Sequence, residues 1–249
     1  MRGRDSRELA SLKMHDSKLA WRDGRFELHL SVSKEMEMNY AYGSILGIDL
    51  GERYSATTVL RQDACKSAPR FYGKEVRSIR RHGAWLRKRL GERKLLRVIR
   101  RIKDSESRRV NTILHQISRA IVNEAIEKKA VIVLGDLKGI RNHTRGRRMN
   151  RIVANMPFYK LTHYITYKAN WAGIHIVTAS EAYTSKTCHN CNSDGKRVNQ
   201  GLFQCLTCGH SWNADYNGAM NIAKKAERLL EHISLGGARG SGPMRGASF

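Results

Sequence analysis

Residues 44–60 read SILGIDLGERYSATTVL and contain two apolar runs separated by the turn sequence DLGER. The first run has the length and composition of a buried strand, and the second can return beside it as an antiparallel strand, with PRFYG (69–73) as a third. The first strand leads into DLGER and not into a glycine-rich phosphate loop. A doubly wound nucleotide-binding domain, the structural alternative, therefore lacks its usual sequence signal.

Beyond residue 73 the pattern changes to alternating helices and strands. Helical spacing and short apolar runs predict, in order, a helical hairpin at 74–109 that turns at Gly91 and Glu92, a helix at 111–130, a strand at 131–135, a helix at 158–173, a strand at 174–180 and a last helix at 214–233. Three strands joined by short turns and followed by alternating helices and strands predict an α/β fold. The expected architecture is an RNase H-like mixed sheet with flanking helices.

The chain is strongly basic. Its 249 residues include 46 Lys or Arg against 22 Asp or Glu, a formal net charge of +24. Such an excess favours a polyanionic partner, and we expect nucleic acid; a basic membrane-surface or ribosomal protein is the alternative. Region 74–109 alone has fifteen basic and four acidic residues, and loop 141–151 adds five arginines that either form a lid or face solvent. The arginines expected to contact nucleic acid are Arg80, Arg81, Arg87, Arg97, Arg100, Arg101, Arg145, Arg147 and Arg148.

The two ends of the chain carry weaker signals. Strict alternation in FELHLSVS (26–33) predicts a half-buried strand with no obvious hairpin partner nearby. The glycine-rich tail, 234–249, is expected to be disordered. No 18-residue apolar run exists and the first residues have no apolar signal region, so neither a membrane helix nor secretion is expected. We expect a cytoplasmic, nucleoid-associated protein.

Four of the five cysteines form two C-x-x-C pairs. Cys188 and Cys191 are separated from Cys205 and Cys208 by thirteen residues. Two such pairs can direct four thiolates at one ion, so this spacing predicts a structural zinc ribbon. His189 and His210 lie beside these cysteines, and we expect them to be surface residues or neighbours of the ligands.

Two aspartates are candidates for a second metal site. Asp49 ends the first strand and Asp215 opens the last helix. If the first and fourth strands lie parallel and adjacent, residue 135 is near Asp49, and Asp215 can approach from the helix. Carboxylates at such a place can hold Mg²⁺ for phosphodiester hydrolysis. The alternatives are that Asp49 is a turn residue and that Asp215 is a helix N-cap.

From Ser44 onward the chain resembles the TnpB proteins, transposon-encoded RNA-guided nucleases related to type V CRISPR effectors. The motifs that carry the resemblance are GIDLG (47–51), HQISRAIVNEA (115–125), VIVLGDLKGIR (131–141), YKANWAG (167–173), EAYTSKTCHNC (181–191), CLTCGHSW (205–212) and DYNGAMNI (215–222). The resemblance implies a RuvC-type centre that cuts DNA with Mg²⁺ under an RNA guide. It implies that Asp49 and Asp215 are the first and third catalytic acids.

The second catalytic motif departs from this family. A glutamate is common before the Asp-Leu pair, and this chain has Gly135 there; Asp136 follows on the opposite strand face. Three explanations remain open. The centre is inactive and the protein binds without cutting, another acid substitutes (Glu181 first, then Asp136), or the chain is a decayed copy.

The resemblance also predicts a division of the chain into parts. The expected segments are a remnant of an N-terminal wedge-like region at 1–43, a RuvC-like domain at 44–183, a zinc ribbon at 184–210, the last helix at 211–233 and the tail at 234–249. A protein that retains so little of the wedge is expected to be N-terminally truncated. A zinc-ribbon ribosomal or transcription protein is the alternative from another class, and it leaves the ordered acids unexplained.

Overall fold

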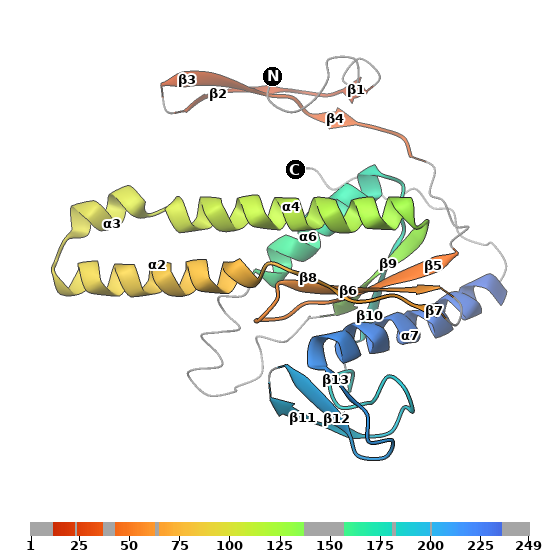
Figure 1. Ribbon diagram of the computed structural model, residues 1–249. Helices are drawn as coiled ribbons and strands as arrows, with labels where there is room; N and C mark the ends of the chain where they lie inside the picture. Colours follow the sequence, from red (N-terminus) through yellow and green to blue (C-terminus); the bar gives the residue numbers. More distant parts are fainter. Residues whose placement is uncertain are drawn as a thin grey trace.

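A six-stranded mixed sheet forms the centre of the molecule (Figure 1). The computed structural model describes residues 12–22, 24–36, 43–62, 65–136, 157–180, 183–199 and 201–235. The strands of the sheet are β5 (Ser44–Asp49), β6 (Ala56–Gln62), β7 (Cys65–Lys66), β8 (Arg70–Tyr72), β9 (Ala130–Asp136) and β10 (Ile176–Ser180). The order is β10-β9-β5-β6, and both β7 and β8 pair with the outer edge of β6.

The pairing directions confirm the strand arrangement expected from the sequence. Strands β5, β9 and β10 are parallel, whereas β6 is antiparallel to β5, to β7 and to β8. The predicted neighbours, the first and fourth strands of the sequence pattern, are β5 and β9. The two-residue strand β7 was not expected, because a run this short has no measurable period.

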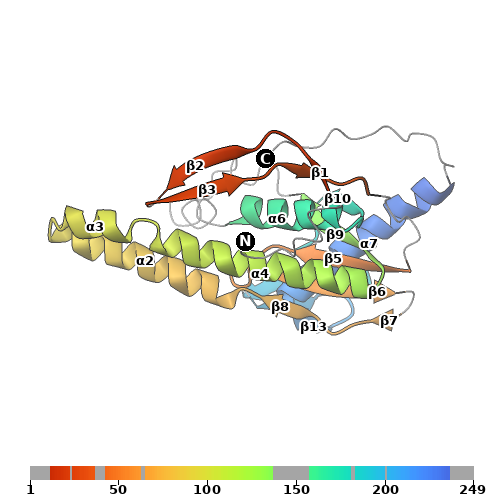
Figure 2. The same ribbon diagram turned by 90° about the horizontal axis from the view of Figure 1, so that it is seen from above.

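Helices cover both faces of the sheet. They are α2 (Lys74–Glu92), α3 (Leu96–Ile102), α4 (Ser105–Glu127), α6 (Phe158–Trp171) and α7 (Ala214–Leu235). Figures 1 and 2 show α4 and α6 on one face and α7 on the other. Among the described residues, none of these helices is both long and apolar enough to cross a bilayer.

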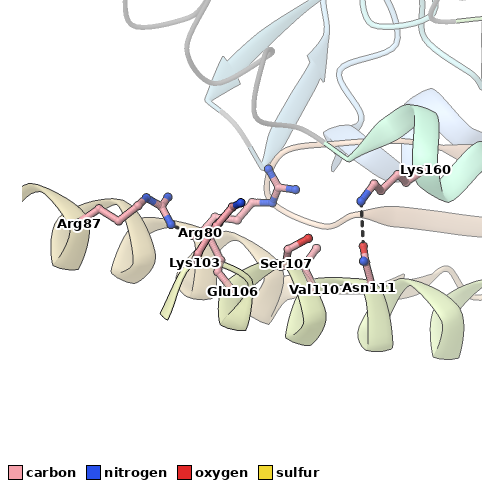
Figure 3. Close-up of a pocket in the computed structure, with 8 residues that line it drawn as sticks. All are labelled: Arg80, Arg87, Lys103, Glu106, Ser107, Val110, Asn111 and Lys160. Carbon is pink, nitrogen blue, oxygen red and sulfur yellow. Dashed lines mark hydrogen bonds and ion pairs between the residues drawn. The ribbon is translucent and has the colours of Figure 1, made fainter. Parts of the chain in front are cut away.

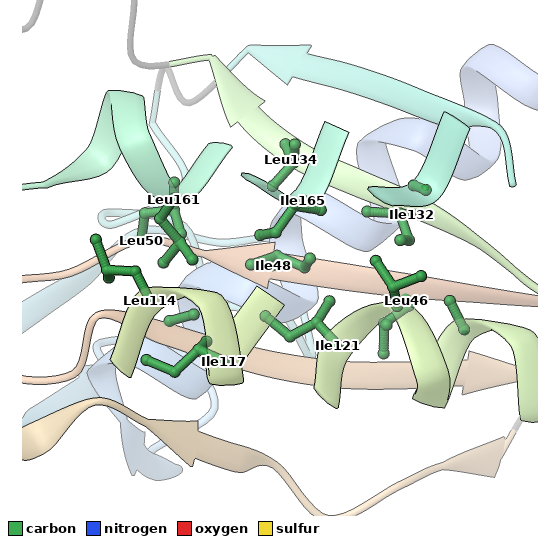
Figure 4. Close-up of a cluster of buried hydrophobic side chains, with 14 of the residues drawn as sticks. Leu46, Ile48, Leu50, Leu114, Ile117, Ile121, Ile132, Leu134, Leu161 and Ile165 are labelled. Carbon is green, nitrogen blue, oxygen red and sulfur yellow. The ribbon is translucent and has the colours of Figure 1, made fainter. Parts of the chain in front are cut away.

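Side chains of the central strands alternate between these two faces, as the pleat requires. Leu46 and Ile48 of β5, with Ile132 and Leu134 of β9, pack against α4 and α6 in the larger core (Figure 4). Val131 and Val133 of β9 point the other way and pack against α7. Burying one such side chain fully stabilises the fold by about 1.5–3 kcal/mol. The near-continuous apolar run of β9 is thus explained by burial on both faces.

Helix α7 approaches the sheet closely at Gly47. A Cβ added at Gly47 would lie 2.6 Å from the carbonyl oxygen of Ala219 and 2.8 Å from Cβ of Ala223. Because glycine has no side chain, the two backbones can come this near. The close contact fixes the position of the first turns of α7 against β5.

A helical arm extends beyond the sheet. Helices α2 and α4 run antiparallel side by side, and α3 lies at the far end between them (Figures 1 and 2). The hairpin predicted at 74–109 exists, but its turn lies at 93–95 and α4 already begins at Ser105. Val76 is the one buried residue of α2, and α3 has none. The arm therefore exposes its basic residues to solvent.

A small three-stranded module precedes α7. It consists of β11 (Gly195–Asn199), β12 (Leu202–Cys205) and β13 (Ser211–Asn213), all antiparallel. Strand β13 pairs with β12, and α7 starts at Ala214, the first residue of the helix predicted at 214–233. Strand pairing carries the module up to the first residue of the helix.

The N-terminal strands differ from the prediction. Residues 26–33 do not form one half-buried strand: β3 (Arg25–His29) pairs with β2 (Lys18–Arg22), and β4 (Val32–Ser33) pairs with β1 (Lys13–Met14). Phe26 and Leu28 are 70% and 62% exposed. The predicted half-burial and the predicted lack of a hairpin partner are therefore wrong, because β2 pairs with β3 and the apolar side chains cover no core among the described residues. The assignment to a wedge-like remnant stays a prediction, and the tail from 236 lies outside the described residues.

Candidate functional site

Asp49 is the last residue of β5 and lies on the sheet face that α7 covers. Gly47, two residues earlier, faces Ala219 and Ala223 of α7. Strand alternation places the Asp49 side chain on that same face. A Cβ added at Gly218 would lie 3.0 Å from Oδ2 of Asp49, so the carboxylate lies directly against the first turns of α7. Gly218 is therefore the residue that leaves room for this carboxylate.

Asp215 is in the first turn of α7 and is buried, with 5% exposed. Its Oδ1 accepts a hydrogen bond of 2.9 Å from Nη2 of Arg197 on β11. Its Oδ2 is buried and has no hydrogen-bond partner among the residues that the structure describes. Burial raises the pKa of Asp215, while the charges of Arg197 and Arg53 act in the opposite direction. A buried carboxylate oxygen without a partner is costly unless a cation or donor satisfies it.

Both aspartates lie at the first turns of α7. Asp215 and Gly218 are three residues apart in the helix and share one side of it, and the Asp49 carboxylate lies at Gly218. Asp215 is not the N-cap, because Oδ1 of Asn213 accepts hydrogen bonds from the backbone N–H groups of Asp215 and Tyr216. Asp49 is not a turn residue, because it is the last residue of β5. Both alternatives drawn from the sequence are thus wrong.

Gly135 lies beside this pair of acids. In the parallel pairing of β5 and β9, Ile48 is opposite Leu134, which brings residue 135 to the level of Asp49. Val131 and Val133 pack against α7. Because side chains alternate along a strand, a side chain at position 135 would point to the same face of the sheet. Asp136 alternates to the face of α4 and α6, away from Asp215. Glu181, the other candidate substitute, lies outside the described residues.

The four paired cysteines form one cluster. Their sulfur atoms all lie within 4.8 Å of one another. The Sγ atoms of Cys188 and Cys208 are 3.8 Å apart, and those of Cys191 and Cys205 are 3.4 Å apart. Tetrahedral Zn–S bonds of about 2.3 Å require sulfur separations of about 3.8 Å. Hydrogen bonding, first from the backbone of Ser193, lowers the pKa of the Cys191 thiol to about 6, which favours the thiolate that metals bind.

The histidines beside the cysteines have different environments. His189 is fully buried between Trp212 and Tyr216, with ring centroids 4.6 and 5.0 Å away. Its Nδ1 lies 3.0 Å from Oδ1 of Asn217. The surface alternative for His189 is therefore wrong, and it is a neighbour of the ligands. His210 is exposed, with Nδ1 3.1 Å from the carbonyl oxygen of Cys208.

Two asparagines of α7 join the cysteine module to the sheet domain. Asn217 donates to the carbonyl oxygen of Thr187 at 2.8 Å, and Asn221 donates to those of Thr184 and Thr187 at 2.9 and 2.7 Å. Sequence reasoning missed this role, although both residues belong to the motif DYNGAMNI. Their spacing of four residues on a helix was the available signal, because it places two amides on one side.

Comparisons with known proteins agree with this arrangement. Residues 158–222 match the family model "Cas12f1-like, TNB domain". The chain is 31% identical over 240 residues to the CRISPR-associated endodeoxyribonuclease Cas12f2 of Micrarchaeota archaeon (strain CG1_02_47_40), covering 85% of this chain and 42% of that protein. It is 29% identical over 136 residues to the TnpB-like protein MJ0751 of Methanocaldococcus jannaschii, covering 54% and 49%. The chain is similar to Cas12f and TnpB-like proteins.

Other relatives and a solved structure extend the similarity. The putative RNA-guided DNA endonuclease InsQ of Escherichia coli (strain K12) is 26% identical over 231 residues, covering 81% of this chain and 54% of that protein. The Cas12f1 chain in a cryo-EM structure of a Cas12f1–sgRNA–target DNA complex has a TM-score of 0.60 at 18% identity, covering 84% and 55%. That likeness supports the mixed α/β fold. This chain spans about half the length of the curated relatives it matches.

The basic arm carries six of the predicted arginines. Arg81, Arg97, Arg100 and Arg101 are exposed, and Arg80 is partly buried. Arg87 forms an ion pair with Glu106 of α4. Arg145, Arg147 and Arg148 lie outside the described residues. Contact of these arginines with nucleic acid stays a prediction.

Proposed function

We propose that this chain is the nuclease portion of a TnpB-type, RNA-guided DNA-binding protein, with an RNase H-like, RuvC-type fold and weakened DNA cleavage. The observation that supports the proposal is that Asp49 lies against Gly218 of α7, three residues after Asp215, at the level of Gly135 in β9. The strand order supports it too, since three antiparallel strands are followed by parallel strands and helices. A ribosomal or transcription protein has no need for acids converging at one end of the sheet.

The cysteine cluster fits a structural zinc ion. Four sulfurs within 4.8 Å of one another match the size of a tetrahedral Cys₄ site. The protein would supply all four zinc ligands, which is typical of structural zinc sites and not of catalytic ones. The ribbon would hold β11 in place, and β11 carries Arg197 to Asp215. Zinc binding and the position of Arg197 are thereby linked.

The carboxylate pair fits Mg²⁺. The donors are hard oxygens, and Oδ2 of Asp215 is buried without a partner. When bound there, Mg²⁺ would supply an activated water and charge stabilisation for phosphodiester hydrolysis. Asp49 and Asp215 would hold the ion, and Arg197 would keep one Asp215 oxygen oriented through its hydrogen bond.

Gly135 removes one ligand from the centre we propose. A two-metal site requires enough carboxylates to hold both ions about 3.5–4 Å apart, and the α7 face of β9 offers none at position 135. Asp136 is a poor substitute because it alternates to the other face of the strand. Substitution by Glu181 remains the second candidate, in which case the centre is fully active.

The substitution Gly135→Glu tests the proposal. The added carboxylate is expected on the α7 face beside Asp49, and it should raise Mg²⁺-dependent cleavage of guide-matched DNA by roughly a hundredfold or more, as expected for a restored electrostatic group. Cleavage is measured with the unmodified protein, Gly135→Glu and Gly135→Glu combined with Asp49→Ala as the inactive control. If the unmodified protein cuts DNA as fast as Gly135→Glu, the proposal of a weakened centre is wrong. The cleavage rate of Glu181→Ala then shows whether Glu181 replaces the missing carboxylate.

A further inference from the structure

A pocket lies where the arm joins the body of the molecule. It is lined by residues of α2, α4 and α6 and has a volume of about 150 Å³ (Figure 3). Four cations line it, Arg80, Arg87, Lys103 and Lys160, against a single acid, Glu106. Arg87 forms an ion pair with that acid, and Lys160 donates to the neutral amide oxygen of Asn111 at 3.2 Å. The lining keeps an excess positive charge, which favours an anion.

A stripe of aromatic rings begins beside this pocket on α6. The α6 stripe consists of Tyr159, His163, Tyr164 and Tyr167. Tyr159 is 79% exposed and stacks on His163 with centroids 6.3 Å apart, and His163 is 5.8 Å from Tyr167. Tyr159 directly precedes Lys160 of the pocket. Residues four apart share one side of a helix, so the stripe follows the surface of α6 away from the pocket.

The stripe continues onto α4. The ring of His115 stacks on Tyr164 with centroids 3.9 Å apart and nearly parallel planes. Burial and the nearby Lys168 lower the pKa of His115, so the ring stays neutral at physiological pH. Proteins that bind unpaired nucleic acid combine exposed aromatic rings, on which bases stack, with cations that contact the phosphates.

We propose that the pocket and the α6 stripe form one binding site for an unpaired nucleic-acid strand, with a backbone phosphate in the pocket and bases stacked on the stripe. The proposal rests on the nucleic-acid binding proposed above. It adds that this surface binds an unpaired strand and not a duplex. Lys160 lines the pocket and directly follows Tyr159 in α6, so the pocket and the α6 stripe begin at neighbouring residues of one helix. A duplex offers no free base face to Tyr159.

The test compares two fluorescent single strands of equal length, an oligothymidylate and an abasic oligonucleotide that has the same phosphates without bases. Tyr159→Ala should weaken oligothymidylate binding roughly tenfold, a typical loss for one stacked base, and leave abasic binding unchanged. Lys160→Gln should weaken both probes and lower the salt slope by about one phosphate contact. Fluorescence anisotropy at several salt concentrations measures both effects.

Two controls make the result specific. Tyr159→Phe keeps the ring and should keep oligothymidylate affinity, and Trp85→Ala removes an exposed ring of α2 outside the site and should leave both affinities unchanged. Equal weakening of both probes by Tyr159→Ala, or no weakening of either, overturns the stacking site. The anisotropy assay requires neither a guide RNA nor added metal, and it does not depend on DNA cleavage. Absence of guide-dependent DNA binding, with this single-strand binding pattern intact, contradicts the proposed function and leaves the stacking site standing.

Discussion

At the scale of single residues, the centre depends on which side chains face α7. The Asp49 carboxylate faces α7 from β5, and Asp215 supplies a second carboxylate from the first turn of α7. Gly218 lets the two approach, because any larger residue would contact Oδ2 of Asp49. At the same level of the sheet Gly135 offers no ligand. The centre that we propose therefore lacks one carboxylate, at position 135.

Gly47 and Gly91 provide a matched pair of alanine substitutions. Gly47→Ala should lower the free energy of unfolding by about 1–3 kcal/mol, because the new methyl group would press on α7. Gly91→Ala, in α2 with nothing within 4 Å of its Cβ position, should raise it by about 0.5–1 kcal/mol. Denaturant unfolding measures both changes. A Gly47→Ala protein as stable as the unmodified chain would contradict the tight contact of β5 with α7.

Lys168 should make stability depend on pH. It is buried between α4 and α6, where Nζ donates to the carbonyl oxygen of His115 at 2.7 Å and to Oγ of Ser118 at 2.6 Å. Burial, followed by the charge of Arg119, lowers the pKa of Lys168 to about 8 from 10.5. Between these values unfolding takes up a proton, so stability rises with pH, and the cost of burying the charge is complete below pH 8.

Lys168→Met tests this pH dependence. The unmodified protein should gain about 1–2 kcal/mol relative to Lys168→Met as the pH rises from 8 to 10, since one pKa unit corresponds to about 1.4 kcal/mol. The same substitution at the exposed Lys160 serves as the control and should leave the pH slope as it is. Identical slopes for Lys168→Met and the unmodified protein would show that Lys168 does not titrate in this range.

At the scale of elements, the cysteine module is expected to depend on the zinc ion that we propose for it. Its core consists of the four cysteines with Phe203, Ala214 and Trp212, which is too small to order three strands alone. Asn217 and Asn221 then join this module to α7. Loss of the metal should therefore disorder β11 and release Arg197 from Asp215.

Cys205→Ser should lower the bound zinc from one equivalent to nearly none and reduce the unfolding midpoint. Elemental analysis of the purified protein measures the metal content. Cys65→Ser changes the cysteine outside the two pairs and is expected to retain the full equivalent. One equivalent of zinc in Cys205→Ser would mean that the cluster is not the zinc site.

At the scale of the whole molecule, charge is concentrated on the arm. Helices α2 and α3 bury almost no side chain, so their basic residues contribute little to the core and remain available to a polyanion. The arm projects from the domain beside α6 (Figure 2). Phosphate contacts made there give affinity that depends on salt and carries no sequence specificity.

Replacing Arg97, Arg100 and Arg101 together by Gln should weaken DNA binding and reduce the salt slope. Each lost phosphate contact lowers the slope of log affinity against log salt by about 0.9, so the expected decrease is about 2 to 3. The corresponding triple Arg→Lys variant keeps the charge and should keep the slope. An unchanged slope in the Gln variant would place the phosphate contacts elsewhere on the molecule.

The sequence by itself determined the elements with a strong period or a strong local rule. The apolar runs of β5 and β9 and the amphipathic α4 were predicted because burial imposes a regular pattern on each. The cysteine cluster was predicted because two C-x-x-C pairs specify their own geometry. The parallel neighbours β5 and β9 followed from the order of elements, and with them the placement of residue 135 near Asp49.

Only the tertiary structure decided how distant residues meet. No local pattern reports that Arg197 reaches Asp215, that Asn217 and Asn221 join the cysteine module to α7, or that Phe26 and Leu28 are exposed. These features arise from packing between elements far apart in the chain. A side chain's alternation or helical spacing says which way it points, but the element that lies opposite is set by the fold as a whole.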